Sequence, residues 1–226
     1  MHKYFIPPST FQTPSYEGLK SDWFTSLKID TVLDIGANVG QFSQTISLII
    51  PDAKIYAFEP IPNCFESLKE SFISNSNVVA FNLGLGDESG KILFEENNIS
   101  VCSSFLKMAD SHKEAFAFTN ISKSIDVEIV RLDDVVEKID IGNALLVKID
   151  VQGYEDKVIK GGYQTIKMAK IIIIETSFVP LYEKQPLFHD IYVQLIDMEF
   201  SFFGFLDDMS DPKTGKILQG DAIFMK

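Results

Sequence analysis

The feature that most constrains the fold is an alternation of short apolar runs with longer stretches of helical spacing. The apolar runs have strand length, and one contains the sequence IIII, which is typical of a strand covered on both faces. These runs are Thr31–Ile35, Lys54–Phe58, Val78–Asn82, Ala144–Ile149 and Lys170–Glu175. In Phe42–Ile50 and Phe65–Ile73, apolar residues recur every three or four positions, as on one face of a helix. This order of elements predicts an α/β fold with a doubly wound parallel sheet.

The two ends of the chain and one internal segment depart from this alternation. Tyr16–Leu27 is predicted to form a helix ahead of the first strand. Ser201–Phe205 and Ile217–Met225 flank the turn-rich sequence DDMSDPKTG, so we expect an antiparallel hairpin there. Asn97–Asp126 fits the alternation poorly and is interpreted as an insertion that covers the site.

Length and composition indicate one globular domain, 1–226, with residues 1–30 as an N-terminal extension and 97–126 as the insertion. The formal net charge of −12 opposes non-specific binding to nucleic acid or anionic membranes. The two cysteines are far apart and lack a CxxC partner, so we expect neither a disulfide framework nor a structural zinc site, and the sequence shows no convincing set of metal ligands. The apolar runs are too short to span a bilayer, and the start lacks a signal-peptide pattern. A cytoplasmic protein is therefore expected.

A glycine turn with an acidic residue follows the first predicted strand. The sequence DIGANVG runs from Asp34 to Gly40, and its glycines let a ligand approach the backbone. Asn38 stands where a pyrophosphate-binding loop has its second glycine, and the Asp34 carboxylate would repel a diphosphate. A cationic nucleoside would instead be attracted to the Asp34 carboxylate. We therefore predict that the loop binds S-adenosylmethionine, and the residues assigned to it are Asp34, Gly36, Ala37, Asn38 and Gly40. The alternative is an ordinary strand-turn-helix corner.

Further acids follow the other predicted strands, at the edge of the sheet where this fold class binds ligands. Glu59 has the offset expected for an acid that accepts both ribose hydroxyls, and Pro60 holds it extended. Asp87 is a candidate to accept a hydrogen bond from the adenine amino group, and a role as an ordinary turn residue is an equal alternative. Asp150 ends the fourth strand, where it can contact the cofactor's cationic end or take a proton from an acceptor hydroxyl. Glu175 ends the fifth and is the second catalytic candidate, with capping or a salt bridge as its alternative.

Other polar residues nearby are assigned structural roles. Glu155 begins a predicted helix and is expected to cap it and compensate its dipole. Lys148 alternates with apolar neighbours and is expected to pair with an acid. His189 precedes the helical run DIYVQLIDM and is expected to be an exposed or N-terminal helix residue.

The motifs together are more specific than any one of them. In chain order they read DIGANVGQFS, AFEPIPNCFESLKE, LGDESG, VRLDDVV, LLVKIDVQGYEDKVIKGG and IIIIET. From about Thr31 to the C-terminus, the chain resembles the FkbM family of S-adenosylmethionine-dependent methyltransferases. The resemblance implies a class I methyltransferase (Rossmann-like) fold, whose seven-stranded sheet is mostly parallel with an antiparallel C-terminal strand. It also implies methyl transfer to a hydroxyl of a sugar, glycan or small natural-product acceptor.

The resemblance assigns roles to the same residues: Asp34, Gly36, Asn38 and Gly40 to the cofactor loop, Glu59 to the ribose, Asp87 to the adenine side and Asp150 to the end of strand four. It also reveals a departure, because Gln152 stands where the family commonly has an acid. Gln can position a hydroxyl but cannot take its proton near neutral pH.

The expected function is O-methylation of a small-molecule or glycan acceptor, with a homo-oligomer left open. The alternatives are a nicotinamide-dependent oxidoreductase, disfavoured by Asp34 and Asn38, and a non-catalytic relative that has kept the fold.

Overall fold

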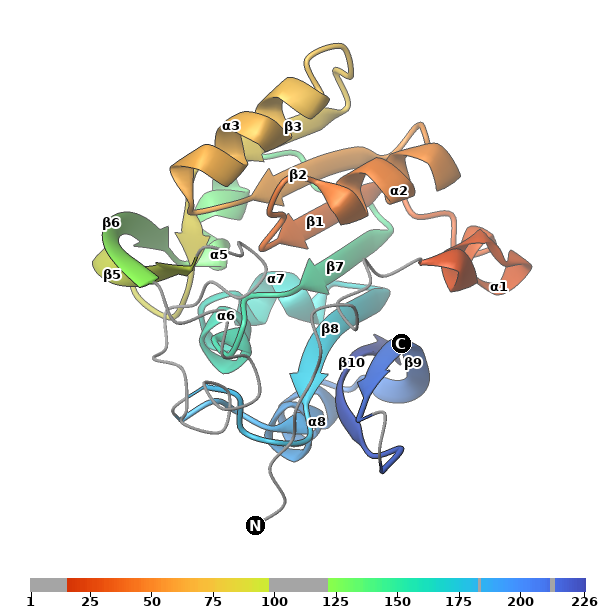
Figure 1. Cartoon of the computed structure of the whole chain (residues 1–226). Coiled ribbons are helices and arrows are strands. Elements are labelled where there is room, and N and C mark those ends of the chain that lie inside the picture. Colours follow the sequence, from red (N-terminus) through yellow and green to blue (C-terminus); the bar gives the residue numbers. More distant parts are fainter. Residues whose placement is uncertain (1–15, 98–121, 183, 212–213) are drawn as a thin grey trace.

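The computed structural model describes residues 16–97, 122–182, 184–211 and 214–226, and its central element is a seven-stranded sheet. The strand order is β3-β2-β1-β7-β8-β10-β9, and helices lie on both faces (Figure 1). The strands are β1 (Thr31–Ile35), β2 (Lys54–Phe58), β3 (Val78–Phe81), β7 (Leu145–Ile149), β8 (Ile171–Ser177), β9 (Ser201–Ser210) and β10 (Ile217–Met225). β10 is antiparallel to both of its neighbours, and the other pairs are parallel. The predicted doubly wound sheet and its C-terminal hairpin are therefore confirmed.

The helices divide between the two faces of the sheet. On one face lie α1 (Asp22–Thr25), α2 (Gln41–Ile49) and α3 (Pro62–Ser71). On the other lie α5 (Leu132–Val135), α6 (Glu155–Gly161), α7 (Tyr163–Lys167) and α8 (Phe188–Asp197), with the 3-10 turn η5 (Val136–Lys138) after α5.

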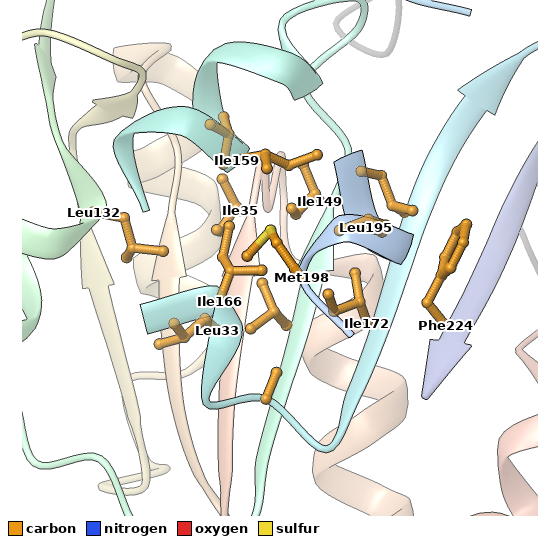
Figure 2. Close-up of a cluster of buried hydrophobic side chains, with 14 of the residues drawn as sticks. Leu33, Ile35, Leu132, Ile149, Ile159, Ile166, Ile172, Leu195, Met198 and Phe224 are labelled. Atoms are coloured by element: carbon orange, nitrogen blue, oxygen red, sulfur yellow. The ribbon is translucent and has the colours of Figure 1, made fainter. Parts of the chain in front are cut away.

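Strands in the middle of the sheet are buried on both sides, which explains their continuous apolar runs. On the α6–α8 face, Leu33 and Ile35 of β1 pack with Ile166 of α7 and Leu195 of α8 (Figure 2). On the opposite face, Val32 packs in a cluster with residues of α1 and α2. Successive residues of one strand thus serve two separate cores.

The predicted helix over Tyr16–Leu27 is wrong in detail. Two short helices stand there, the 3-10 turn η2 (Glu17–Lys20) and α1, because Ser21 between them is extended (φ −78°, ψ 155°). Leu19 and Phe24 are fully buried against the sheet. The described part of the N-terminal extension therefore belongs to the core.

A second sheet, which the sequence analysis missed, has the order β4-β6-β5. Its strands are β4 (Gly84–Leu85), β5 (Gly90–Asn97) and β6 (Ser122–Val130). The predicted insertion begins and ends in this sheet, and residues 98–121 lie outside the described part of the chain. The alternation that marks β6 was present in the sequence, since Val127 and Ile129 are buried whereas Asp126 and Glu128 are exposed.

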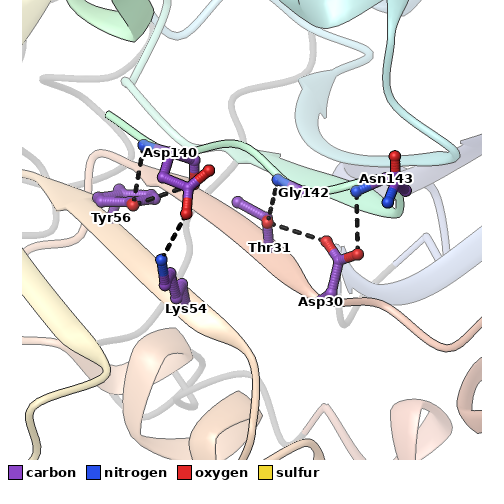
Figure 3. A network of polar contacts seen from close by, with 7 residues as sticks. All are labelled: Asp30, Thr31, Lys54, Tyr56, Asp140, Gly142 and Asn143. Atoms are coloured by element: carbon purple, nitrogen blue, oxygen red, sulfur yellow. Dashed lines mark hydrogen bonds and ion pairs between the residues drawn. The ribbon is translucent and has the colours of Figure 1, made fainter. Parts of the chain in front are cut away.

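A polar network fixes the amino ends of the central strands (Figure 3). The Asp30 carboxylate accepts hydrogen bonds from the Thr31 hydroxyl and the Asn143 N–H, both 2.9 Å. Beside it, the Lys54 ammonium lies 2.7 Å from Asp140. These contacts tie the segment before β7 to the starts of β1 and β2 and leave the opposite, carboxyl edge for the candidate site.

Candidate functional site

The loop between β1 and α2 is built on residues with left-handed backbone. Gly36, Asn38 and Gly40 have φ of +84°, +51° and +94°, which glycine adopts without strain and Asn tolerates. A Cβ atom at Gly36 would lie 1.8 Å from the Asp150 carbonyl oxygen, so the loop is pressed against the end of β7. Ala37 is buried beneath the loop. The predicted loop geometry is therefore present.

Glu59 joins this loop to the end of β2. Its two carboxylate oxygens accept the backbone N–H groups of Asn38 and Ile61, each at 2.8 Å. Burial raises the pKa of Glu59 to about 7, although these two N–H donors oppose the rise. The Asn82 side chain donates to the carbonyl oxygens of Glu59 and Pro60, at 2.9 and 3.0 Å. Asn82 was not predicted as a site residue; its position at the end of the third predicted strand was the signal.

Asp34 lies below the loop as a buried charge. Only 1% of the residue is exposed, and its carboxylate accepts the Ser43 hydroxyl of α2. Burial raises the pKa of Asp34 to about 6, and the Ser43 hydrogen bond and the Lys148 ammonium oppose the rise. The residue supports the loop from within and contributes its charge to the site through the protein.

Lys148 pairs with acids, as predicted. It is 1% exposed, and its Nζ lies 2.8 Å from Asp221 Oδ1 and 3.6 Å from Asp150 Oδ2. Burial lowers the pKa of Lys148, but the two carboxylates outweigh it and raise the pKa well above its ordinary range. Asp221, an acid in the middle of the apolar last strand, was not predicted as the partner of Lys148.

The two predicted catalytic acids share one partner. The Gln152 amide nitrogen donates to Asp150 Oδ1 at 2.8 Å and to Glu175 Oε2 at 2.5 Å. The Gln152 amide oxygen accepts the Tyr182 hydroxyl at 3.0 Å. The Asp150 side chain is 29% exposed. Burial and the Asp150 charge raise the pKa of Glu175 well above its ordinary value. The structure therefore brings Asp150 and Glu175 together.

Two other acids lie at the ends of α6. Asp87 lies 2.7 Å from Lys160 and 3.6 Å from Lys157, and the hydrogen bond from Lys160 lowers its pKa. Its predicted contact with adenine stays a prediction. Glu155 is 3% exposed and accepts the Gly153 N–H at 3.0 Å, and burial raises its pKa to about 7. It orders the loop after β7, in line with the structural role expected of it.

The described residues contain neither a metal-binding cluster nor a membrane-spanning helix. No group of three or more His, Cys, Asp or Glu side chains in the described ranges is arranged to hold a metal ion. None of the described helices has the length and apolar character needed to cross a membrane. His189 is exposed in the first turn of α8, as expected.

Negative charge predominates at the carboxyl edge. The acids are Asp34, Glu59, Asp150, Glu155, Glu175 and Asp221, and among the described residues Lys148 is the one buried cation. Burial raises the pKa of most of these acids, because the protein supplies too little positive charge around them. Such a site fits a cationic ligand.

Comparison with known proteins agrees with this fold. The methyltransferase FkbM domain matches residues 34–202. The chain is 29% identical over 160 residues to the 2-O-methyltransferase NoeI of Sinorhizobium fredii, covering 68% of this chain and 66% of that protein. It is 29% identical over 147 residues to the hexuronic acid methyltransferase AglP of Haloferax volcanii, covering 65% and 55%. The chain thus spans less than two thirds of the length of these curated relatives.

A solved structure, that of methyltransferase FkbM from Methylobacillus flagellatus, matches all of this chain and 49% of its own, with a TM-score of 0.57 and 12% identity. At that identity, the match supports the fold alone.

Proposed function

The chain belongs to the FkbM family of methyltransferases, and on that premise we propose that it methylates a hydroxyl of a sugar, glycan or small natural-product acceptor, with S-adenosylmethionine as donor. The observation that carries this proposal is the surplus of buried carboxylates around Lys148 at the carboxyl edge. The two relatives support the acceptor class, since one is a 2-O-methyltransferase and the other a hexuronic acid methyltransferase.

The residues at this edge fit S-adenosylmethionine. The ligand carries a sulfonium and an ammonium group and no phosphate, so its charge offsets the acids, whereas the diphosphate of a nicotinamide cofactor adds to them. We assign the cofactor to Asp34, Gly36, Ala37, Asn38, Gly40, Glu59, Pro60, Asp87 and Asp150. When bound, it supplies an electrophilic methyl group.

On the acceptor side, we assign Asp150 and Glu175. Asp150 combines partial exposure with a fixed position, because Gln152 and Lys148 both contact its carboxylate. It can orient an acceptor hydroxyl and take its proton as the hydroxyl oxygen is methylated. Burial raises the pKa of Glu175, and in its protonated form the Glu175 carboxyl group can donate a hydrogen bond to the acceptor.

We take residues 1–226 to form one methyltransferase domain, in which 1–30 and 97–126 contribute to acceptor specificity. The cytoplasmic location and a homo-oligomer stay predictions.

The test is a methyl-transfer screen with radiolabelled S-adenosylmethionine against neutral glycosides, uronic acid glycosides, nucleotide sugars and small hydroxylated metabolites. The wild type should label at least one hydroxylated acceptor, and Asp150→Asn should lose most of that label. Labelling confined to a carboxyl or amino group of the acceptor would overturn the proposed O-methylation.

A further inference from the structure

Gln152 stands in a backbone conformation that non-glycine residues rarely adopt. Its φ is +54°, and Gly153 follows with φ +99°. Such a conformation persists only where the surroundings impose it. Here the buried Glu155 carboxylate accepts the Gly153 N–H at 3.0 Å, which fixes the turn between β7 and α6. The fixed turn aims the Gln152 side chain across the sheet edge toward β8.

The Gln152 amide makes contacts at both of its ends. Its nitrogen donates to Asp150 and Glu175, and its oxygen accepts the Tyr182 hydroxyl. An amide nitrogen has two hydrogens, so it can serve two acceptors at once. Tyr182 donates to the amide oxygen, which leaves the amide nitrogen directed at the two acids.

Tyr182 is itself held in place. It is 2% exposed, and its backbone N–H donates to the Gln185 side-chain oxygen at 3.2 Å. The Gln185 amide nitrogen donates in turn to the hydroxyl of Ser177, the last residue of β8, at 2.9 Å. A continuous chain of hydrogen bonds thus leads from the end of β8 through Tyr182 and Gln152 to the two acids.

We propose that Gln152 is the positioning residue of the acceptor side, whose amide, oriented by Tyr182, holds the Asp150 and Glu175 carboxyl groups together where an acceptor hydroxyl is bound. The inference rests on the proposed function, because it assumes that these acids serve an acceptor. The residue type follows from the charges. A carboxylate at this position would add another charged acceptor beside the Asp150 and Glu175 carboxyl groups, whereas an amide donates to both without adding charge.

The effect on Glu175 has a definite sign. A donor favours the ionised form of the carboxyl group that it contacts, so the amide lowers the pKa of Glu175 against the larger effect of burial. Removing the amide should therefore raise that pKa further.

The test is a carboxyl ¹³C NMR titration of the full chain without cofactor, in which Glu175→Gln identifies the Glu175 signal. Gln152→Ala should raise the pKa of Glu175 by about one pH unit or more, the size expected for loss of one charge-assisted hydrogen bond. Tyr182→Phe, which leaves the turn untouched, should raise it less and in the same direction. Gln194→Ala is the matched control, because the Gln194 amide donates within its own helix, to the Asp190 carbonyl oxygen at 3.2 Å.

A Glu175 titration that stays within about 0.3 pH units of wild type in both Gln152→Ala and Tyr182→Phe would overturn the proposal. If Gln152→Ala does not fold, Tyr182→Phe alone decides. The titration needs no cofactor, so it tests the role of Gln152 even if S-adenosylmethionine does not bind. A failure of S-adenosylmethionine to bind would count against the proposed function only. With an acceptor from the screen, Gln152→Ala should also move the pH profile of kcat to higher pH, which a purely structural role would not do.

Discussion

Replacing Asp34 by Asn should stabilise the protein at alkaline pH and weaken its binding of S-adenosylmethionine. Asp34 is 1% exposed and accepts the Ser43 hydroxyl. Asn has nearly the same shape and keeps an oxygen for that hydroxyl, so it imitates the protonated form of Asp34. The substitution therefore removes a buried charge without leaving Ser43 unpartnered.

The magnitude follows from the pKa. Burial raises the pKa of Asp34 from its ordinary 3.8 to about 6. A pKa raised on folding means that the stability due to the protonated carboxyl is present below pH 3.8 and is lost as pH rises through 6. At 1.36 kcal/mol per pH unit, the wild type loses about 3 kcal/mol that Asp34→Asn does not lose, as an upper value.

The assay is urea unfolding at pH 4.5 and pH 8, with Asp52→Asn as a control at an exposed position. The free energy of unfolding of Asp34→Asn relative to wild type should rise by about 2 kcal/mol between the two pH values, because part of the loss of about 3 kcal/mol has already occurred at pH 4.5. The relative stability of Asp52→Asn should stay constant within about 0.5 kcal/mol. An Asp34→Asn variant whose relative stability does not change, or falls, with rising pH would refute the argument from burial.

Three further substitutions test the site. Glu59→Gln should weaken S-adenosylmethionine binding about tenfold or more in a calorimetric titration, because one charge-assisted acceptor is lost, whereas Glu70→Gln on α3 should not. Asp150→Asn should lower turnover about a hundredfold at saturating cofactor, and a rate within about threefold of wild type would refute its catalytic role. Gly36→Ala should lower the melting temperature strongly and abolish cofactor binding, because its Cβ would lie 1.8 Å from the Asp150 carbonyl oxygen; Gly90→Ala, with open space at its Cβ, should melt like wild type.

Local patterns made much of the fold predictable. The strands of the central sheet appear as apolar runs because both of their faces are buried. Such a run consists of residues adjacent in sequence, so it can be recognised without knowledge of the fold. The glycine loop was predictable for a similar reason, since Gly36, Asn38 and Gly40 are the residue types that left-handed backbone selects.

Long-range contacts were not predictable from those patterns. Asp221 lies 73 positions from Lys148, and Tyr182 lies 30 positions from Gln152. Asp221 is recognisable as an acid within an apolar strand, but the local sequence does not show which residue it or Tyr182 contacts, because the pairing arises only once the strands are assembled. The same limit applies to Asp34, whose carboxylate is buried against α2 and accepts the Ser43 hydroxyl, a contact that the loop sequence did not mark.

The most direct test of the central claim is calorimetric titration of the wild type with S-adenosylmethionine at pH 6 and pH 8, in buffers of different ionisation enthalpy. Binding should have a Kd in the micromolar range, about −8 kcal/mol. Binding should be tighter at pH 8 and should release protons at pH 6, because a cationic ligand favours the ionised forms of Asp34, with its pKa near 6, and Glu59, with its pKa near 7. Micromolar binding of NAD, with no response to S-adenosylmethionine at either pH, would contradict it.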